Sequence, residues 1–168
     1  MIQEFFTAVF KAGLPVGIAS YALVWWALKN DYLGSVASMK DFEGKVKQLA
    51  KEKDPKIKAD PVHKKWLAFG GGFYGVVGFL TYAVVELGEI RDFIVQFESI
   101  RVFISEISTD MFIALAVDAL KNFIVAISWP VYWMSDIRSD HIWIWFVVAY
   151  GGYWAGARFA LQTFNNKL

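Results

Sequence analysis

Four charged residues lie within or at the ends of stretches that are otherwise apolar: Glu86, Asp118, Lys121 and Arg158. A charge at the centre of a bilayer costs on the order of 3 kcal/mol on insertion scales, so such groups usually pair or line a water-filled path. As one intramembrane cluster they could carry ions or protons. Asp118 and Lys121 stand three residues apart, so on a helix they could instead neutralise each other. We favour structural charge pairs, because 168 residues leave little protein for transport machinery.

The other reactive side chains form no catalytic or metal-binding arrangement. The chain has no cysteine, which excludes disulfides and thiolate chemistry. The hydroxyl groups of Ser20, Thr81 and Ser128 lie in apolar stretches that contain no histidine to activate them. His63 and His141 lie at the edges of such stretches, whereas a membrane haem would need its axial histidines inside them. We therefore predict a protein that is not an enzyme and that binds neither a cofactor nor a metal.

Glycine residues form a second pattern, which concerns packing rather than chemistry. They recur three or four residues apart in three of the apolar stretches, a spacing that places them on one face of a helix. In lipid, faces of small residues let two helix backbones approach closely. This spacing is compatible with contacts within one chain and with contacts between chains. The glycines that we predict at helix contacts are Gly13, Gly17, Gly71, Gly75, Gly78, Gly152 and Gly156.

The apolar stretches are long enough to cross a membrane as helices. The clearest covers residues 66–87, and a helix of that length extends for about 33 Å, which matches the hydrocarbon core of a bilayer. We expect the three glycines of this span to make the tightest helix contact in the protein, against one of the other two glycine pairs. The four predicted spans are residues 13–28, 66–87, 111–134 and 141–161.

Two charged segments connect these spans. Residues 29–65 hold ten lysines, and their apolar residues recur every three or four positions, which predicts an amphipathic helix near lipid headgroups. The Asp60-Pro61 step predicts the start of the next helix, with the aspartate as its N-cap. Residues 88–110 are also amphipathic, and they are too charged to span. The sequence thus predicts one all-α domain, residues 1–168, a polytopic membrane protein with four transmembrane helices plus two amphipathic segments.

The distribution of lysine and arginine predicts the orientation of the chain in the membrane. Eleven of these residues fall in segments 29–65 and 135–140, against five on the other side, and the excess marks the cytoplasmic side. Residues 29–65 are then cytoplasmic, and both termini lie on the opposite side. Seven of the eight tryptophans fall at the same predicted interface, which agrees with this placement. We predict that the protein lies in the inner membrane of a bacterium.

Three functional hypotheses follow from these patterns. The first is a non-catalytic integral membrane subunit, or an assembly or scaffold partner, of a larger membrane protein complex. Its partners are the lipid bilayer and other membrane subunits or further copies of the chain, and no nucleic acid, because acidic residues interrupt the lysines of segment 29–65. The alternative is a small oligomeric channel or transporter that uses the intramembrane charge cluster. A membrane-embedded enzyme has the least support, because no catalytic arrangement is found.

Overall fold

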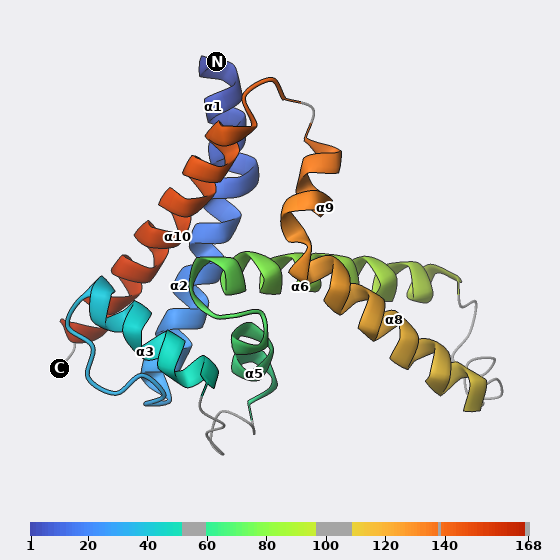
Figure 1. The fold of residues 1–168 in the computed structure, drawn as a ribbon, viewed down its shortest axis with the longest axis horizontal. Helices are drawn as coiled ribbons and strands as arrows, with labels where there is room; N and C mark the ends of the chain where they lie inside the picture. Colours follow the sequence, from blue (N-terminus) through green and yellow to red (C-terminus); the bar gives the residue numbers. More distant parts are fainter. Residues whose placement is uncertain (52–59, 97–108, 138, 167–168) are drawn as a thin grey trace.

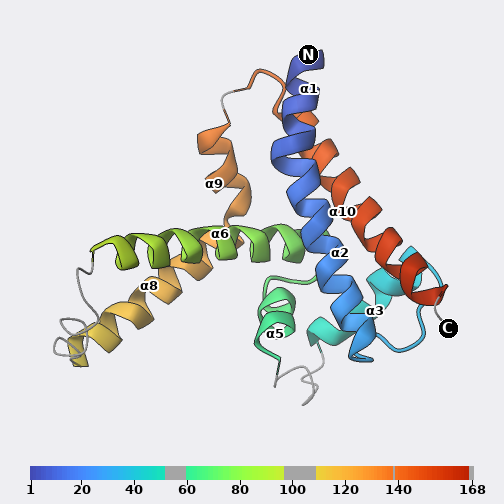
Figure 2. The same ribbon diagram turned by 180° about the vertical axis from the view of Figure 1, so that it is seen from behind.

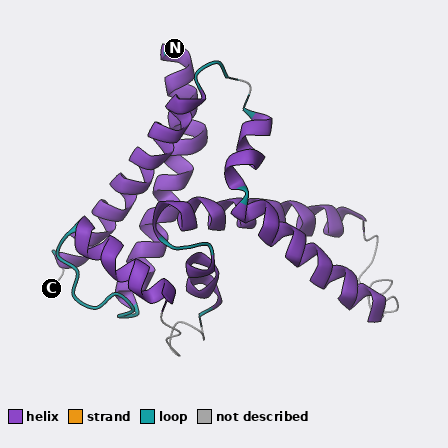
Figure 3. Cartoon of the chain, viewed as in Figure 1, coloured by secondary structure: helices purple, strands orange, loops and turns teal. Residues whose placement is uncertain are grey.

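The computed structural model of the protein describes residues 1–51, 60–96, 109–137 and 139–166. All regular secondary structure in these ranges is helical, which confirms the predicted all-α class (Figure 3). The predicted amphipathic segment 88–110 begins inside a long helix and continues into residues outside the described ones. The elements, which Figure 1 shows in chain order, are α1 (Ile2–Ala8), the π-helix η1 (Val9–Gly13), α2 (Leu14–Lys29), α3 (Met39–Lys51), α5 (Pro61–Ala68), α6 (Gly72–Gln96), α8 (Thr109–Ile127), α9 (Trp129–Asp136) and α10 (Ile142–Asn165).

The first three elements form one continuous helix, Ile2–Lys29. It has 28 residues, a length of about 42 Å, whereas the sequence predicted a span that begins near Gly13. Among the described helices it is the one that is long and apolar enough by itself to cross a bilayer. Helices α5 and α6 would supply a second span if they form one broken segment. By length and composition, the described helices therefore support one or two of the four predicted spans.

A proline explains the π-helix in the middle of this first helix. Pro15 has no N–H group, and its ring would clash with the carbonyl of Lys11, four residues earlier, in a regular α-helix. The backbone N–H of Leu14 instead donates to the carbonyl of Val9, five residues earlier, which makes one wide turn. The helix therefore continues through the proline and does not begin beside it.

Helices α2 and α10 form the tightest pair in the fold, and they run in the same direction (Figure 1). A Cβ atom on Gly152 would overlap the carbonyl of Gly13, and one on Gly156 would overlap the carbonyl of Gly17. The hydroxyl of Ser20, buried in the same contact, donates to the carbonyl of Tyr153 at 2.9 Å. Two glycine pairs thus bring the backbones together, and the Ser20 hydroxyl gains a partner across the gap.

The parallel pair changes the predicted topology. At one end, the amide of Asn165 near the C-terminus donates to the carbonyl of Val36, in the segment after α2. At the other end, the ring of His141 lies 3.2 Å from the carboxylate of Glu4. The prediction that both termini lie opposite to residues 29–65 is therefore wrong for the C-terminus. Segment 135–140 lies on the N-terminal side, so Trp143 and Trp145 are not at the same end as Trp25 and Trp26.

The predicted span 66–87 is not one helix, because it breaks at residues 70–72. All three are glycines with positive φ, +95°, +62° and +53°, a conformation that glycine adopts without steric cost and that cannot continue a right-handed helix. The N–H groups of Gly70 and Gly71 donate back to the carbonyls of Leu67 and Trp66, the pattern of a Schellman C-cap. Helices α5 and α6 consequently meet at an angle of 118°. Helix α6 runs across the direction of the α2–α10 pair in Figures 1 and 2.

The predicted span 111–134 is also broken. Helix α8 ends at Ile127 and α9 begins at Trp129, with Pro130 in its first turn. The proline lacks the N–H that a continuous helix would need, so the chain changes direction there (Figure 1). Helix α8 then lies against α6, and α9 stands beside the N-terminal helix.

Helix α3 supplies the amphipathic helix that was predicted in residues 29–65. Ser38 caps its first turn, because its hydroxyl accepts the N–H of Asp41 at 3.2 Å. Phe42 and Val46 on one face are fully buried. That face packs against the bend between α5 and α6 and joins a core that extends to α10. Large buried residues of this core are Phe42, Trp66, Val76 and Tyr153.

Candidate functional site

Gly71, Gly75 and Gly78, the glycines predicted to pack in span 66–87, are all buried, but they do not share one partner. A Cβ atom on Gly71 would overlap the Val46 side chain of α3. One on Gly75 would lie 2.9 Å from the carbonyl of Trp66 in α5, and one on Gly78 would lie 3.2 Å from the carbonyl of Ala126 in α8. The prediction that they make the tightest contact, against another glycine pair, is wrong. The two other glycine pairs pack against each other instead.

The structure places the four charged residues of the predicted cluster on three helices. Lys121 and Asp118 form an ion pair of 2.9 Å on α8, the pairing that their spacing predicted. Glu86 on α6 faces the amide of Asn122 at 3.5 Å. Arg158 on α10 lies over the ring of Trp154, 4.8 Å from its centre. Asn122 follows Lys121 on α8 and lies four residues after Asp118, so Glu86 contacts the helix that carries the ion pair. Among the described residues no ion pair joins Glu86 to Arg158.

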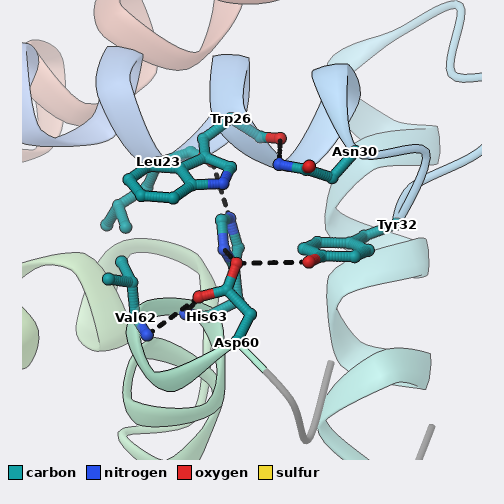
Figure 4. A network of polar contacts seen from close by, with 7 residues as sticks. All are labelled: Leu23, Trp26, Asn30, Tyr32, Asp60, Val62 and His63. Carbon is teal, nitrogen blue, oxygen red and sulfur yellow. Dashed lines mark hydrogen bonds and ion pairs between the residues drawn. The ribbon is translucent and has the colours of Figure 1, made fainter. Parts of the chain in front are cut away.

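A buried pair that the sequence did not single out joins α5 to α2 (Figure 4). The ring of His63 is only 1% exposed, and its Nδ1 lies 2.8 Å from the carboxylate of Asp60. On the other side of the ring, Nε2 lies 3.1 Å from the carbonyl of Leu23. Asp60 is the N-cap that was predicted, and it also accepts the N–H of Val62 at 2.9 Å and the hydroxyl of Tyr32 at 3.2 Å.

Hydrogen-bond acceptors lie on both sides of the His63 ring. The carboxylate of Asp60 faces Nδ1 and the carbonyl of Leu23 faces Nε2, so each contact suits an N–H group on the ring. Burial alone would raise the pKa of Asp60, but the hydrogen bonds from His63 and the charge interaction with that ring outweigh it and lower the pKa below its ordinary value. Asp60 is therefore held as a carboxylate, with the His63 ring as its buried partner.

Three aromatic rings surround the His63 imidazole edge-on. Their centres lie 5.1 to 5.9 Å from the centre of the His63 ring. They come from three different parts of the chain: Trp26, Tyr32 and Trp66. Since every polar partner of the ring belongs to this chain, the pair works as a lock between α2 and α5. His63 follows the predicted N-cap, Asp60, by three residues. That spacing was the signal in the sequence that could have revealed the pair.

An apolar groove of about 430 Å³ lies between the N-terminal helix, α6, α9 and α10. Its volume falls within the roughly 300–1,000 Å³ of typical ligand sites. Aliphatic and indole side chains form most of its wall, and Thr7 and Lys11 contribute polar groups from the N-terminal helix. Representative lining residues are Val77, Leu80, Trp133, Trp145, Phe146 and Ala149.

One end of the groove is closed by polar contacts. The hydroxyl of Ser139 donates to the carboxylate of Glu4 and accepts the backbone N–H of His141 at 3.0 Å. The same carboxylate lies 3.2 Å from Nδ1 of His141. These bonds tie the first helix to the connection between α9 and α10, next to Ile137 and Ile142 of the groove wall. Ser139 and His141 do not meet through their side chains, so they do not form a nucleophile and base.

Comparison with known proteins assigns no function to these features. Within the described ranges no three His, Asp or Glu side chains are grouped so that they could hold a metal ion. No protein-family model, curated protein or solved structure matches the chain.

Proposed function

We propose that this chain is a non-catalytic integral membrane subunit, or assembly partner, of a larger membrane protein complex. The apolar helix Ile2–Lys29 supports the membrane location. The ten lysines of residues 29–65 support a cytoplasmic position for that segment, and the C-terminal end of α10 lies on the same side of our proposed arrangement.

One observation carries the proposal of a partner. Helix α8 exposes five large apolar side chains at intervals of four, three, four and three residues, a spacing that forms one stripe along a helix. They are 40% to 60% exposed: Ile113, Val117, Leu120, Ile124 and Ile127. The opposite side of α8 is already used, because Asn122 and Ala126 are buried against α6.

The stripe suits a helix of another subunit better than lipid alone. Lipid tails accept apolar side chains at any position around a helix, whereas a partner helix needs them on one side. The Asp118–Lys121 ion pair lies beside the stripe, since Lys121 is four residues from Val117 and three from Ile124. A polar pair at the edge of an apolar contact resembles the charged flanks of paired helices.

A photo-crosslinking amino acid at Leu120 tests this proposal in native membranes. We expect a discrete crosslinked protein that is absent when the same group replaces Ile18, which is 61% exposed on α2. The substitution Leu120→Asp should also remove the crosslinked protein from the complex isolated in mild detergent. Equal crosslinking to lipid from both positions would contradict the proposal, and a crosslink to a second copy of the chain would favour self-association.

The alternative of a channel or transporter has less support. It depends on Glu86, Asp118, Lys121 and Arg158 acting together, and within the described ranges no ion pair joins Arg158 to the other three. We therefore place the chain in a complex without assigning it a transport path.

A further inference from the structure

Lys11 is the charged residue among the side chains that line the apolar groove. It is exposed and lines the groove together with Thr7 and Pro15, which lie four residues to either side on the same helix face. Its ammonium group makes no ion pair within the described part of the chain. The carboxylate of Glu4, on the same helix, is already engaged by Ser139 and His141.

This lysine lies inside the π-helix. The wide turn over Val9–Gly13 is required by Pro15, and it contains Lys11 itself. Single π turns inside α-helices occur frequently at functional sites. The combination is a cation without an ion-pair partner among the described residues, at a wide helical turn in the wall of an otherwise apolar groove.

We infer that the groove holds one acyl chain of an anionic phospholipid, with the headgroup phosphate at Lys11. The apolar wall excludes a polar solute from most of the groove, and the cation complements a negative headgroup. Indole rings such as Trp133 and Trp145 are suited to the boundary between acyl chain and headgroup.

Native mass spectrometry of the full chain, delipidated in detergent, tests this directly. Phosphatidylglycerol and phosphatidylcholine with identical acyl chains are titrated separately, and bound lipids are counted. We expect one tightly bound phosphatidylglycerol and weaker binding of phosphatidylcholine. Lys11→Met should weaken phosphatidylglycerol binding about fivefold, the factor for about 1 kcal/mol from one basic residue. Lys11→Arg should retain it, and Lys29→Met, at the far end of the helix, should leave it unchanged.

A second variant separates the acyl chain from the headgroup. Ala149→Phe places a ring in the groove, so it should weaken binding of both lipids, whereas Val147→Phe on the exposed side of the same helix should not. Equal binding of the two lipids by the native chain, or no loss in Lys11→Met, would overturn the headgroup assignment. Full binding by a folded Ala149→Phe protein would overturn the groove assignment. The inference shares the membrane location of the proposed function, but it is measured on the isolated chain, so it can fail while the partner on α8 is found.

Discussion

The α2–α10 pair and the α6–α8 pair both consist of long apolar helices, but different forces hold them together. In the first pair the backbones touch at two glycine pairs, and Ser20 makes a cross-helix hydrogen bond. In the second pair Gly78 is the one glycine among the described residues that allows a close backbone approach. Side chains supply the rest: the amide of Asn122 donates to the carboxylate of Glu89 at 2.7 Å, and the hydroxyl of Tyr74 donates to the carbonyl of Ile127.

This difference concerns how each contact is made, since both pairs also expose apolar side chains, including Trp143, Val147, Tyr150 and Trp154 on α10. The glycine contact fills the space between two backbones and leaves no part of it for another molecule. The α6–α8 pair uses one side of α8 and leaves an apolar stripe on the other. We therefore expect substitutions in the α2–α10 pair to act on folding, and substitutions on the stripe to act on assembly.

The largest effect should occur at the His63–Asp60 lock, which joins α2 to α5, the helix that precedes α6. His63→Gln removes the ring that pairs with Asp60 and leaves a buried carboxylate without it, which typically costs about 3–5 kcal/mol. Adding Asp60→Asn should recover much of this loss, because asparagine still caps the helix and no charge remains. Thermal unfolding in detergent, followed by circular dichroism, measures both variants. A His63→Gln protein as stable as the native chain would show that the pair contributes nothing to the joint.

The second largest effect should occur at the glycine contact between α2 and α10, and the adjacent residue Gly151 provides the control. A methyl group on Gly152 meets the backbone of Gly13, which cannot move aside as a flexible side chain could. Gly152→Ala should therefore lower stability by about 1–3 kcal/mol, the usual cost of overpacking. Gly151 has open space around its Cβ position, so Gly151→Ala should be neutral or stabilising by up to about 1 kcal/mol. Equal melting temperatures for the two variants would remove the distinction between the helix pairs.

The sequence predicted local features better than their partners. The N-cap at Asp60 and the ion pair of Asp118 with Lys121 follow from short spacings, and both are present. The spacing of glycines predicts which face of a helix packs, but it carries no information about which face lies opposite. Gly13 and Gly17 therefore could not be matched to α10 in advance.

The errors in the predicted fold have one origin. We assumed that each apolar stretch continues as a helix because lipid offers no other partner for the backbone. Residues 70–72 show why this fails: three glycines in the left-handed region can turn the chain while the backbone still bonds to the end of α5. A break in a predicted span also changes the side of the membrane on which the following segment would lie. The count of lysine and arginine assumed four crossings, of which the described helices support one or two by length and composition.

A smaller effect should appear when the pH is lowered and the carboxylate of Asp60 takes up a proton. The pKa of Asp60 is lower in the folded protein than the roughly 3.9 of an unfolded aspartate, so folding favours the carboxylate. The stability that it contributes is fully present above that unfolded value and is lost as the pH falls through the folded pKa. Melting temperatures of the native chain and of Asp60→Asn should therefore converge below about pH 4. A constant difference from pH 6 to pH 3 would contradict this assignment.

The smallest effect on the isolated chain should come from the ion pair beside the stripe. Lys121 and Asp118 are 67% and 48% exposed in their side chains, and exposed pairs contribute only about 0–1 kcal/mol. Lys121→Met, alone or with Asp118→Asn, should thus hardly change unfolding in detergent. In native membranes a partner on the stripe would exclude solvent from the pair, and the single variant would then leave an uncompensated carboxylate. Lys121→Met should therefore reduce the yield of assembled protein more than the double variant does. If both variants assemble like the native chain, the stripe is covered by lipid, and the two helix pairs differ only in how they are packed.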